Sequence, residues 1–245
     1  MIKLENISKN YGVKSILDNI NFEFEKGFVY GIIGPNGSGK TTLIDLLTSN
    51  LKPDNGVVLV DEIPIDEYTL LKRARKLAYL PQNATTQFGF TVEELLHMGT
   101  YSGRKLKEKC DDSKKENYIK QTEIQDFRHK KVTELSGGEL QRVMFAKTLC
   151  QESEALILDE GTSNADIYFK VNYFKLLREQ AIRNKLVIAV VHDLSFARKY
   201  CDKLVILKDQ KIYRAGKSRE VLDEIALKEV FNIEGEFYKD ALLLI

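Results

Sequence analysis

The sequence predicts an α/β fold with a mostly parallel sheet and a helical insert. Three apolar runs in the second half of the chain, at residues 155–158, 186–191 and 204–207, are continuous rather than alternating. Such runs are typical of strands that helices cover on both faces. Helical segments separate the three runs, and this alternation of buried strands with helices favours a parallel sheet.

The first part of the chain contributes further short strands and one helix. The third strand-like run leads directly into a glycine-rich segment and then into a helical pattern. In order along the chain, we expect strands at residues 2–7, 16–24, 28–33, 57–60 and 77–80, a helix at 41–49, and later helices at 167–182 and 194–200.

The middle of the chain changes to helical patterns without strands. We therefore assign residues 85–151 to a helical subdomain, inserted into an α/β core that residues 1–84 and 152–245 form together. A length of 245 residues suits one large domain or one domain with a small insert.

Two helix starts in this insert carry the capping-box pattern. Thr91 is followed three residues later by Glu94, and Ser136 is followed in the same way by Glu139. A charged run at residues 104–120 is expected to be a solvated surface helix or loop.

The charges of the chain almost cancel, because 37 Lys and Arg residues face 36 Asp and Glu residues. A net charge of +1 gives no global field toward nucleic acid or anionic lipid, so we expect no nucleic-acid partner. The longest apolar run has six residues, far below the ~18–20 that a membrane-spanning helix needs. The amino-terminal residues carry an early acid and no apolar segment, so they are not expected to form a secretory signal.

The cysteines and histidines show no metal-binding or disulfide pattern. No C-x-x-C pair occurs and the histidines lack metal-ligand spacing, so buried or incidental thiols are favoured over a redox or zinc role. The residues concerned are Cys110, Cys150, Cys201, His97, His129 and His192.

A phosphate-binding loop follows the strand predicted at residues 28–33. The segment from Gly34 to Thr41 matches the P-loop pattern G-x-x-x-x-G-K-[ST]. Its glycines let the backbone N–H groups face one point at a helix N-terminus, where an anion binds. Lys40 supplies a charge for the β- and γ-phosphates, and the Thr41 hydroxyl can bind Mg²⁺. This segment predicts a nucleotide site.

Two acids, Asp159 and Glu160, end the apolar run at residues 155–158. Alone, such a pair is a common strand end. Beside a P-loop, Asp159 fits the carboxylate that binds Mg²⁺, and Glu160 is placed to act as general base on the attacking water.

The segment from Leu135 to Arg142, Leu-Ser-Gly-Gly-Glu-Leu-Gln-Arg, resembles the signature motif of the ATP-binding-cassette (ABC) ATPases. The resemblance covers essentially the whole chain, and the motifs follow the order of the family. Tyr11 matches the aromatic that stacks on adenine, Gly34 to Thr42 the Walker A motif, Gln82 the Q-loop, Asp159 and Glu160 the Walker B acid and catalytic glutamate, residues 163–166 the D-loop, and His192 the switch histidine.

The resemblance implies a P-loop NTPase core of ABC-ATPase type, with an antiparallel β part and the helical subdomain. It implies ATP hydrolysis, with ATP and Mg²⁺ as the bound groups. The implied catalytic residues are Glu160, His192 and Gln82, and the implied metal site is Thr41, Gln82 and Asp159. The implied nucleotide-binding residues are Tyr11, Gly34, Pro35, Asn36, Gly37, Ser38, Gly39, Lys40, Thr41, Thr42, Ser136, Gly137, Gly138 and Glu139.

Several of these residues have ordinary structural interpretations. Ser136 with Glu139 could be a plain helix cap, His192 a core histidine, and Tyr11 a packing residue. The chain also departs from the usual family pattern: Gly161 follows the glutamate where proline is common, Glu139 replaces a glutamine, and the D-loop reads Ser-Asn-Ala-Asp. None of these departures removes a group that handles phosphate.

In the family, the signature site meets the γ-phosphate held by the P-loop of another copy. The resemblance therefore implies a head-to-tail dimer that sandwiches two ATP molecules. Segments such as Phe90-Thr91-Val92-Glu93-Glu94 resemble the ATPases of importers for iron–siderophore, haem and vitamin B12. The expected function is to power uptake of such a metal chelate through a separate integral membrane permease, with an extracytoplasmic substrate-binding protein. The expected location is the cytoplasmic face of the membrane.

Alternatives remain open at this point. Zinc and manganese importers share much of the pattern, and a soluble non-transport ABC ATPase, such as an iron–sulfur assembly scaffold, would carry the same motifs. A small-molecule kinase with a P-loop would leave the signature and His192 without a role.

Overall fold

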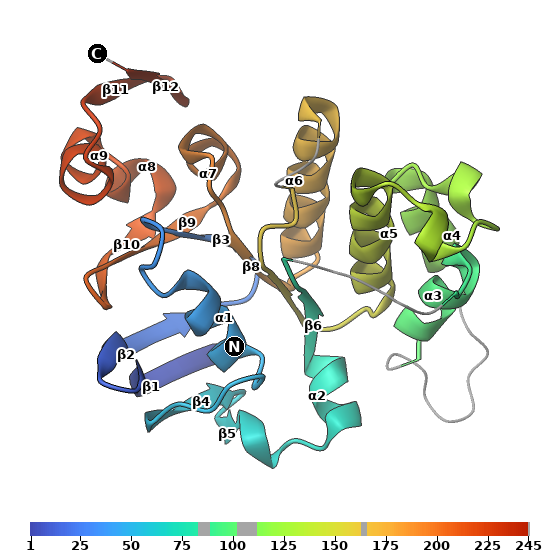
Figure 1. The fold of residues 1–245 in the computed structure, drawn as a ribbon, viewed down its shortest axis with the longest axis horizontal. Helices are drawn as coiled ribbons and strands as arrows, with labels where there is room; N and C mark the ends of the chain where they lie inside the picture. Colours follow the sequence, from blue (N-terminus) through green and yellow to red (C-terminus); the bar gives the residue numbers. More distant parts are fainter. Residues whose placement is uncertain (83–88, 102–111, 163–165, 245) are drawn as a thin grey trace. The chain divides into compact units, whose positions relative to one another are not determined.

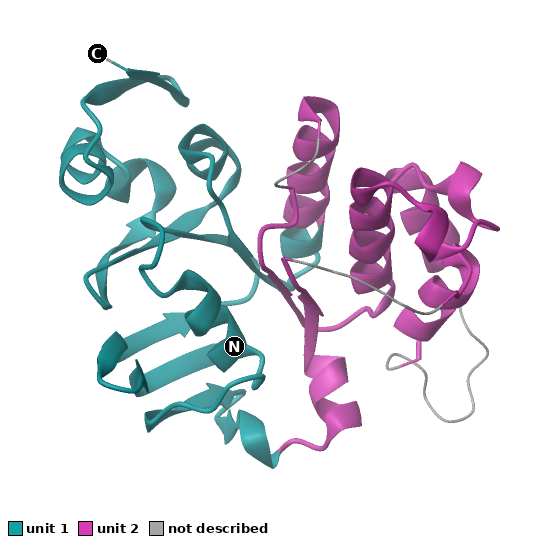
Figure 2. Cartoon of the chain, in the orientation of Figure 1, with its two compact units in different colours: residues 1–67, 180–245 teal, residues 68–179 magenta. Residues whose placement is uncertain are grey.

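The computed structural model describes residues 1–82, 89–101, 112–162 and 166–244. The chain forms two compact units, of which unit 1 consists of residues 1–67 and 180–245 and unit 2 of residues 68–179 (Figure 2). The elements are labelled in Figure 1, and each unit is described by itself.

Unit 1 begins with an antiparallel sheet in the strand order β2-β1-β4-β5. Its strands are β1 (Ile2–Tyr11), β2 (Lys14–Phe24), β4 (Asn55–Val60) and β5 (Ile63–Pro64), and a 3₁₀ turn, η1 (Ile65–Glu67), follows. The side chains of Ile2, Leu4 and Ile7 are buried on one face of this sheet. The antiparallel β part that the resemblance implies is thereby confirmed.

The same unit contains a parallel sheet around β3 (Val29–Ile33). Strand β3 pairs in parallel with both β8 (Leu186–Val190) and β9 (Lys203–Lys208), and β10 (Lys211–Lys217) pairs antiparallel with β9. Every residue of β3 and β8 is buried, as expected for strands covered on both faces. The helices after β3 and β8 are α1 (Lys40–Leu47) and α7 (Leu194–Tyr200).

The C-terminal part of unit 1 was not predicted from the sequence. It consists of α8 (Ser218–Val221), α9 (Glu224–Phe231) and a hairpin of β11 (Gly235–Tyr238) and β12 (Ala241–Leu244). Arg198 connects α7 to this part. Its guanidinium lies 4.4 Å from the ring centroid of Phe237 and donates a hydrogen bond to the carbonyl oxygen of Leu222.

Unit 2 contains two parallel strands and most of the helices of the middle region. Strand β6 (Leu77–Leu80) pairs in parallel with β7 (Ala155–Leu158), and β7 is buried throughout. The helices are α2 (Leu70–Lys76), α3 (Val92–Gly99), α4 (Asp112–Gln121), α5 (Gly137–Cys150) and α6 (Ile167–Ile182), whose last turn belongs to unit 1, together with the 3₁₀ turns η2 (Gln125–Phe127) and η3 (Val132–Glu134).

The capping boxes are confirmed at both predicted helix starts. Thr91 caps α3 and exchanges hydrogen bonds with Glu94, and Ser136 caps α5 and does so with Glu139. The charged run at residues 104–120 is expected to be a solvated surface helix or loop, and its described part is a helix with mostly exposed or half-buried residues. Helix α4 buries Lys115, Tyr118 and Ile119 on its inner face. The subdomain boundaries at 85 and 151 stay a prediction.

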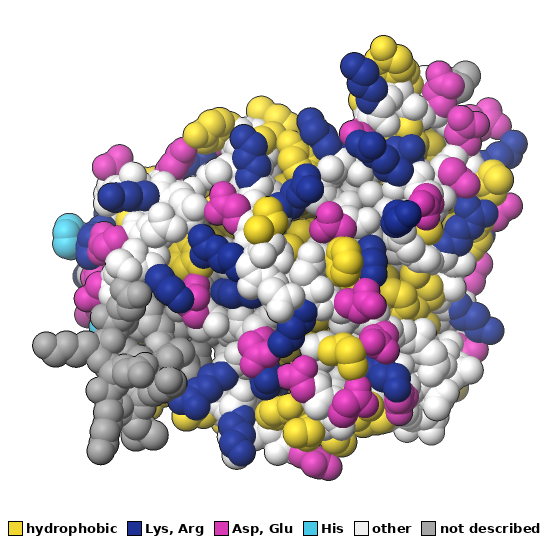
Figure 3. Space-filling view, turned by 180° about the vertical axis from the view of Figure 1, so that it is seen from behind, with side chains coloured by type: hydrophobic (Ala, Val, Ile, Leu, Met, Phe, Trp, Pro, Cys, Tyr) yellow, Lys and Arg dark blue, Asp and Glu magenta, His cyan; other side chains and the backbone are white. Residues whose placement is uncertain are grey.

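None of the helices in the described residues is long and apolar enough to cross a membrane. On the face drawn in Figure 3, acidic and basic side chains are interspersed, in keeping with the balanced charge of the chain. Cys150 and Cys201 are free and buried, whereas Cys110 lies outside the described residues.

Candidate nucleotide-binding and catalytic site

The predicted P-loop of unit 1 connects β3 to α1. Gly34, Gly37 and Gly39 all have positive φ angles, of 155°, 78° and 96°. A Cβ atom at Gly34 would lie 2.7 Å from Ser38 Oγ and closer still to the carbonyl oxygen of Leu207, so there is no room for a side chain. Glycine is therefore required here both by backbone conformation and by close packing.

Lys40 and Ser38 lie inside this loop. The Lys40 ammonium donates to the carbonyl oxygens of Gly34 and Pro35, both at 2.9 Å, and the residue is only 7% exposed. The Ser38 hydroxyl oxygen is buried and has no hydrogen-bond partner among the described residues. Because the N-cap residue of α1, Gly39, has no side chain to cap the helix, the first-turn N–H groups suit a bound anion.

A hollow of about 250 Å³ opens beside the P-loop. It is lined by three segments of unit 1, at residues 14–16, 35–38 and 208–210. The sequence predicted only the middle segment. The other two are the start of β2 and the end of β9 with the turn that follows it. They carry no motif, and each brings one lysine, Lys14 or Lys208, to the rim.

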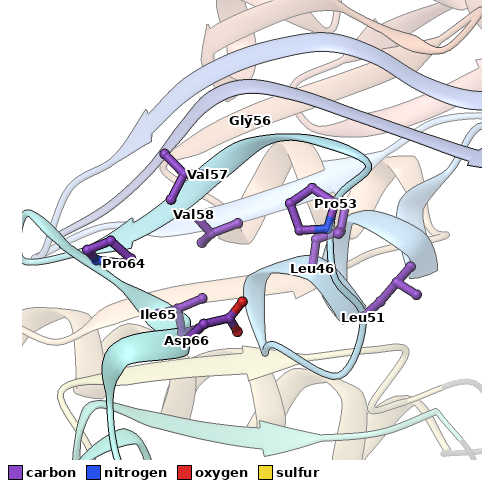
Figure 4. A pocket seen from close by; sticks show the side chains of 9 residues that line it. All are labelled: Leu46, Leu51, Pro53, Gly56, Val57, Val58, Pro64, Ile65 and Asp66. Carbon is purple, nitrogen blue, oxygen red and sulfur yellow. The ribbon is translucent and has the colours of Figure 1, made fainter.

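A second pocket of unit 1, of about 60 Å³, has the opposite chemistry (Figure 4). Aliphatic and proline side chains dominate its lining, and its single carboxylate, Asp66, accepts a hydrogen bond from Ser49 at 2.6 Å. The lining residues are Leu46, Leu51, Pro53, Gly56, Val57, Val58, Pro64, Ile65 and Asp66. This pocket does not suit a phosphate.

Six predicted nucleotide-binding residues of unit 1 are not part of the lining of the 250 Å³ hollow: Tyr11, Gly34, Gly39, Lys40, Thr41 and Thr42. Tyr11 ends β1 with 53% of its surface exposed, available for stacking. Thr41 is exposed and Thr42 half-buried on the first turn of α1.

The parallel register of the sheet brings His192 to the same edge as the P-loop. Val190 of β8 pairs with Ile32 of β3, and the chain continues by two residues from each to His192 and Gly34. His192 is exposed at this edge. It is therefore not the core histidine that its apolar surroundings in the sequence allow.

The predicted acids and the Q-loop glutamine lie together in unit 2. Leu80 of β6 pairs with Leu158 of β7, so Gln82 and Glu160 follow the same ends of two paired strands. The Gln82 amide nitrogen donates to Glu160 Oε2 at 2.7 Å. Asp159 is 1% exposed, and its backbone N–H donates to the Leu80 carbonyl at 2.8 Å.

The backbone around Glu160 is unusual. Glu160 has a φ angle of 53°, in the left-handed region that residues other than glycine rarely adopt. Its carbonyl oxygen accepts a hydrogen bond from the Gln141 amide at 3.3 Å, and the next residue, Gly161, packs against Tyr173. Sequence reasoning missed Gln141 and Tyr173, because their contacts depend on how α5 and α6 pack.

The signature motif forms the N-terminus of α5. Glu139 accepts a hydrogen bond from the Ser136 backbone N–H at 2.7 Å, which holds the pKa of its carboxyl below the ordinary value. Among the described residues, a Cβ atom at Gly137 or Gly138 would meet no atom within 4 Å. The chain's own packing therefore does not explain these two glycines.

The donor set suits the expected bound groups. Unit 1 offers the Thr41 hydroxyl, and unit 2 offers the Gln82 amide oxygen and the Asp159 carboxylate; each is an oxygen ligand of the kind that Mg²⁺ prefers. For ATP, the fit rests on the P-loop glycines, the buried Lys40 and the buried hydroxyl of Ser38.

A phosphate-binding loop between a buried parallel strand and a helix defines a P-loop nucleoside triphosphatase. The family model described as "ABC transporter" matches residues 17–163 of the chain. The chain belongs to the ABC transporter family and is an ATPase of that family.

Relatives of known name match over nearly the whole chain. The hemin import ATP-binding protein HmuV of Thermobifida fusca (strain YX) is 33% identical over 231 residues, which is 94% of this chain and 81% of the relative. The petrobactin import ATP-binding protein FpuD of Bacillus anthracis is 34% identical over 245 residues, which is 98% of this chain and 90% of the relative.

A solved structure agrees with this assignment. The dimeric structure of MJ0796, a bacterial ABC transporter cassette, superposes with a TM-score of 0.78 at 26% sequence identity, covering 89% of this chain and 99% of that one. The predicted family, fold class and enzyme class are confirmed. The roles of individual site residues stay predictions, and residues 163–165 of the expected D-loop lie outside the described residues.

Proposed function

We propose that this chain powers the uptake of a metal chelate, of the iron–siderophore, haem or cobalamin type, through a separate membrane permease. The observation that carries this proposal is the similarity, over nearly the full length, to ATP-binding proteins of hemin and petrobactin import. The chain itself supplies the ATPase.

In this proposal the chain's own groups carry out hydrolysis. The P-loop N–H groups and Lys40 bind the phosphates, and Tyr11 stacks on the adenine. Thr41, Asp159 and the Gln82 amide oxygen would hold Mg²⁺, which neutralises phosphate charge when bound.

Glu160 then acts as general base. Its carboxylate takes a proton from a water whose oxygen attacks the γ-phosphorus, while the bond from that phosphorus to the β–γ bridging oxygen breaks. ADP and inorganic phosphate leave. The exposed imidazole of His192 donates a hydrogen bond to a γ-phosphate oxygen and so stabilises the negative charge of the transition state.

A second copy of the chain completes each site in this proposal. The capped N-terminus of α5 presents Ser136 to the γ-phosphate held by the other copy, head to tail. The open space in front of Gly137 and Gly138 supports this arrangement, because glycine there serves close approach of something outside the chain. Further partners are an integral permease and, through it, an extracytoplasmic binding protein, with the chain peripheral on the cytoplasmic side.

Two measurements test the proposal. Glu160→Gln removes the base but keeps the shape, so ATP should still bind while turnover falls at least about 100-fold. Undiminished turnover would exclude Glu160 as the base.

For the cargo, the chain is purified with its permease from detergent-solubilised membranes and reconstituted. Its ATPase rate is then measured with binding protein loaded with ferric siderophore, hemin or cobalamin, and with zinc or manganese as controls. Stimulation by the chelates only is the expected result. Stimulation of the ATPase rate by zinc or manganese alone would reject the proposed cargo. Purification of the chain only in a soluble complex, without a permease, would also reject it.

A further inference from the structure

Gly161, directly after the proposed base, lies against the ring of a tyrosine. A Cβ atom at this position would lie 2.7 Å from Tyr173 Cζ and 2.8 Å from Cε2, and closer still to the hydroxyl oxygen. Real Cβ atoms essentially never show contacts below 3.0 Å. The tyrosine therefore occupies the space that a side chain at residue 161 would need.

Tyr173 has no room to withdraw from this contact. It is 2% exposed, and its ring centroid lies 4.4 Å from Phe145, 5.4 Å from Phe174 and 6.3 Å from Phe169. Interiors packed in this way transmit a displacement rather than absorb it. The position of the tyrosine hydroxyl is thus fixed by the aromatic cluster between α5 and α6.

The residue before Gly161 needs such support. Glu160 has a left-handed φ of 53°, a conformation that persists in a non-glycine residue only when its surroundings impose it. The Gln141 amide holds the Glu160 carbonyl at 3.3 Å, and the Gln82 amide holds its carboxylate at 2.7 Å. Tyr173 packs against the next residue, Gly161.

We propose that Tyr173 is a positioning residue for ATP hydrolysis, which fixes the Glu160–Gly161 turn and thereby aims the Glu160 carboxylate. This inference rests on the proposed role of Glu160 as the base. It also explains why glycine stands at residue 161, where the family commonly has proline: the tyrosine and a larger side chain at 161 exclude one another.

The test enlarges the side chain at residue 161 and reduces the one at residue 173, separately and together. Each variant is measured by steady-state ATPase kinetics on the purified chain, with its permease where turnover requires it. Gly161→Ala should lower kcat about tenfold and leave KM for ATP within about twofold, since positioning acts on the transition state. Tyr173→Leu should also lower kcat. In the double variant Gly161→Ala/Tyr173→Leu, kcat should exceed that of Gly161→Ala, because the smaller side chain makes room for the new methyl group.

Phe174→Leu is the matched control, since Phe174 is 3% exposed in the same aromatic cluster but is not among the three nearest atoms to the Gly161 position. It should lower the unfolding temperature as Tyr173→Leu does, but with a smaller loss of kcat, because it loosens the packing around Tyr173 and leaves the tyrosine itself against Gly161. If Tyr173→Leu does not fold, Tyr173→Phe replaces it, because removing the hydroxyl relieves the shortest contact and should give partial rescue.

The proposal is overturned if Gly161→Ala keeps the kcat of the wild type. It is also overturned if neither double variant exceeds Gly161→Ala, or if Phe174→Leu loses kcat as much as Tyr173→Leu. Glu160→Gln separates this failure from failure of the base assignment. Full turnover in Glu160→Gln rejects the base, whereas loss there with no effect at Gly161 and Tyr173 rejects only the positioning role.

Discussion

Two P-loop glycines, Gly34 and Gly37, differ in the space around them, and this difference predicts that alanine destabilises the protein more at Gly34 than at Gly37. Gly37 has a left-handed φ of 78°, but a Cβ atom there would meet nothing within 4 Å. Gly34 also has a positive φ, and a Cβ atom there would meet Ser38 Oγ at 2.7 Å and the Leu207 carbonyl oxygen of β9. Alanine at Gly37 is thus only strained, whereas alanine at Gly34 is strained and overpacked.

The cost of each change follows from these contacts. Left-handed strain costs about 1–2 kcal/mol, so Gly37→Ala should lower the unfolding temperature by roughly 2–8 °C. Overpacking against a backbone carbonyl of a buried sheet adds about 1–3 kcal/mol. The unfolding temperature of Gly34→Ala should therefore lie about 2–12 °C below that of Gly37→Ala. Gly34→Ala should also bind ATP more weakly than Gly37→Ala, since relief of the clash moves the loop.

The assay is thermal unfolding of both variants by circular dichroism, together with titration of ATP. Equal unfolding temperatures for the two variants would refute the reasoning, because the close approach of Gly34 to β9 would then cost nothing. A Gly34→Ala variant that binds ATP as the wild type does would refute the second part.

Three further results are expected. Thr91→Ala and Ser136→Ala each remove a capping side chain and should cost about 1 kcal/mol in thermal unfolding, but only Ser136→Ala should reduce ATP turnover. The pKa of Glu93 lies below its ordinary value of 4.5, because hydrogen bonds from neighbours such as Lys115, at 2.6 Å, outweigh the effect of burial. Its contribution to stability is present above that value and lost as the pH falls through the lowered pKa, so Glu93→Gln should flatten the acid fall of the unfolding temperature. Burial raises the pKa of the Cys201 thiol, so iodoacetamide at pH 8 should label it only after denaturation, as mass spectrometry can measure.

Equal turnover of the two capping variants would remove Ser136 from the nucleotide site. An unchanged acid profile in Glu93→Gln would mean that other carboxyl groups dominate acid unfolding, and rapid labelling of native Cys201 would contradict its burial beside Gly31.

The local parts of the fold and site could be predicted from the sequence because short spacing determines them. The P-loop needs only neighbouring residues, and each capping box joins residues three apart, as at Ser136 and Glu139. The buried strands were found because both their faces are apolar. Strand β10 was missed, since half-exposed charged residues interrupt its pattern.

The supports of the site could not be predicted because they depend on packing between distant segments. Gln141 reaches the Glu160 carbonyl across nineteen positions of sequence, and Tyr173 on α6 contacts Gly161 across twelve. Lys115 looked like one of many surface charges, yet it is buried beside Glu93. Sequence patterns specify what a residue can do, but not which residue it will meet.

The central strand of unit 1 has a consequence for biosynthesis. Strand β3 ends at residue 33, but its two neighbours, β8 and β9, are residues 186–190 and 203–208, so β3 leaves the ribosome well before them. At about 5–20 residues per second, β3 therefore waits roughly ten seconds or more with both edges unpaired. All of unit 2 is synthesised during this interval and can fold first. An unpaired apolar strand is prone to aggregate, so the nascent chain is vulnerable until β8 and β9 emerge.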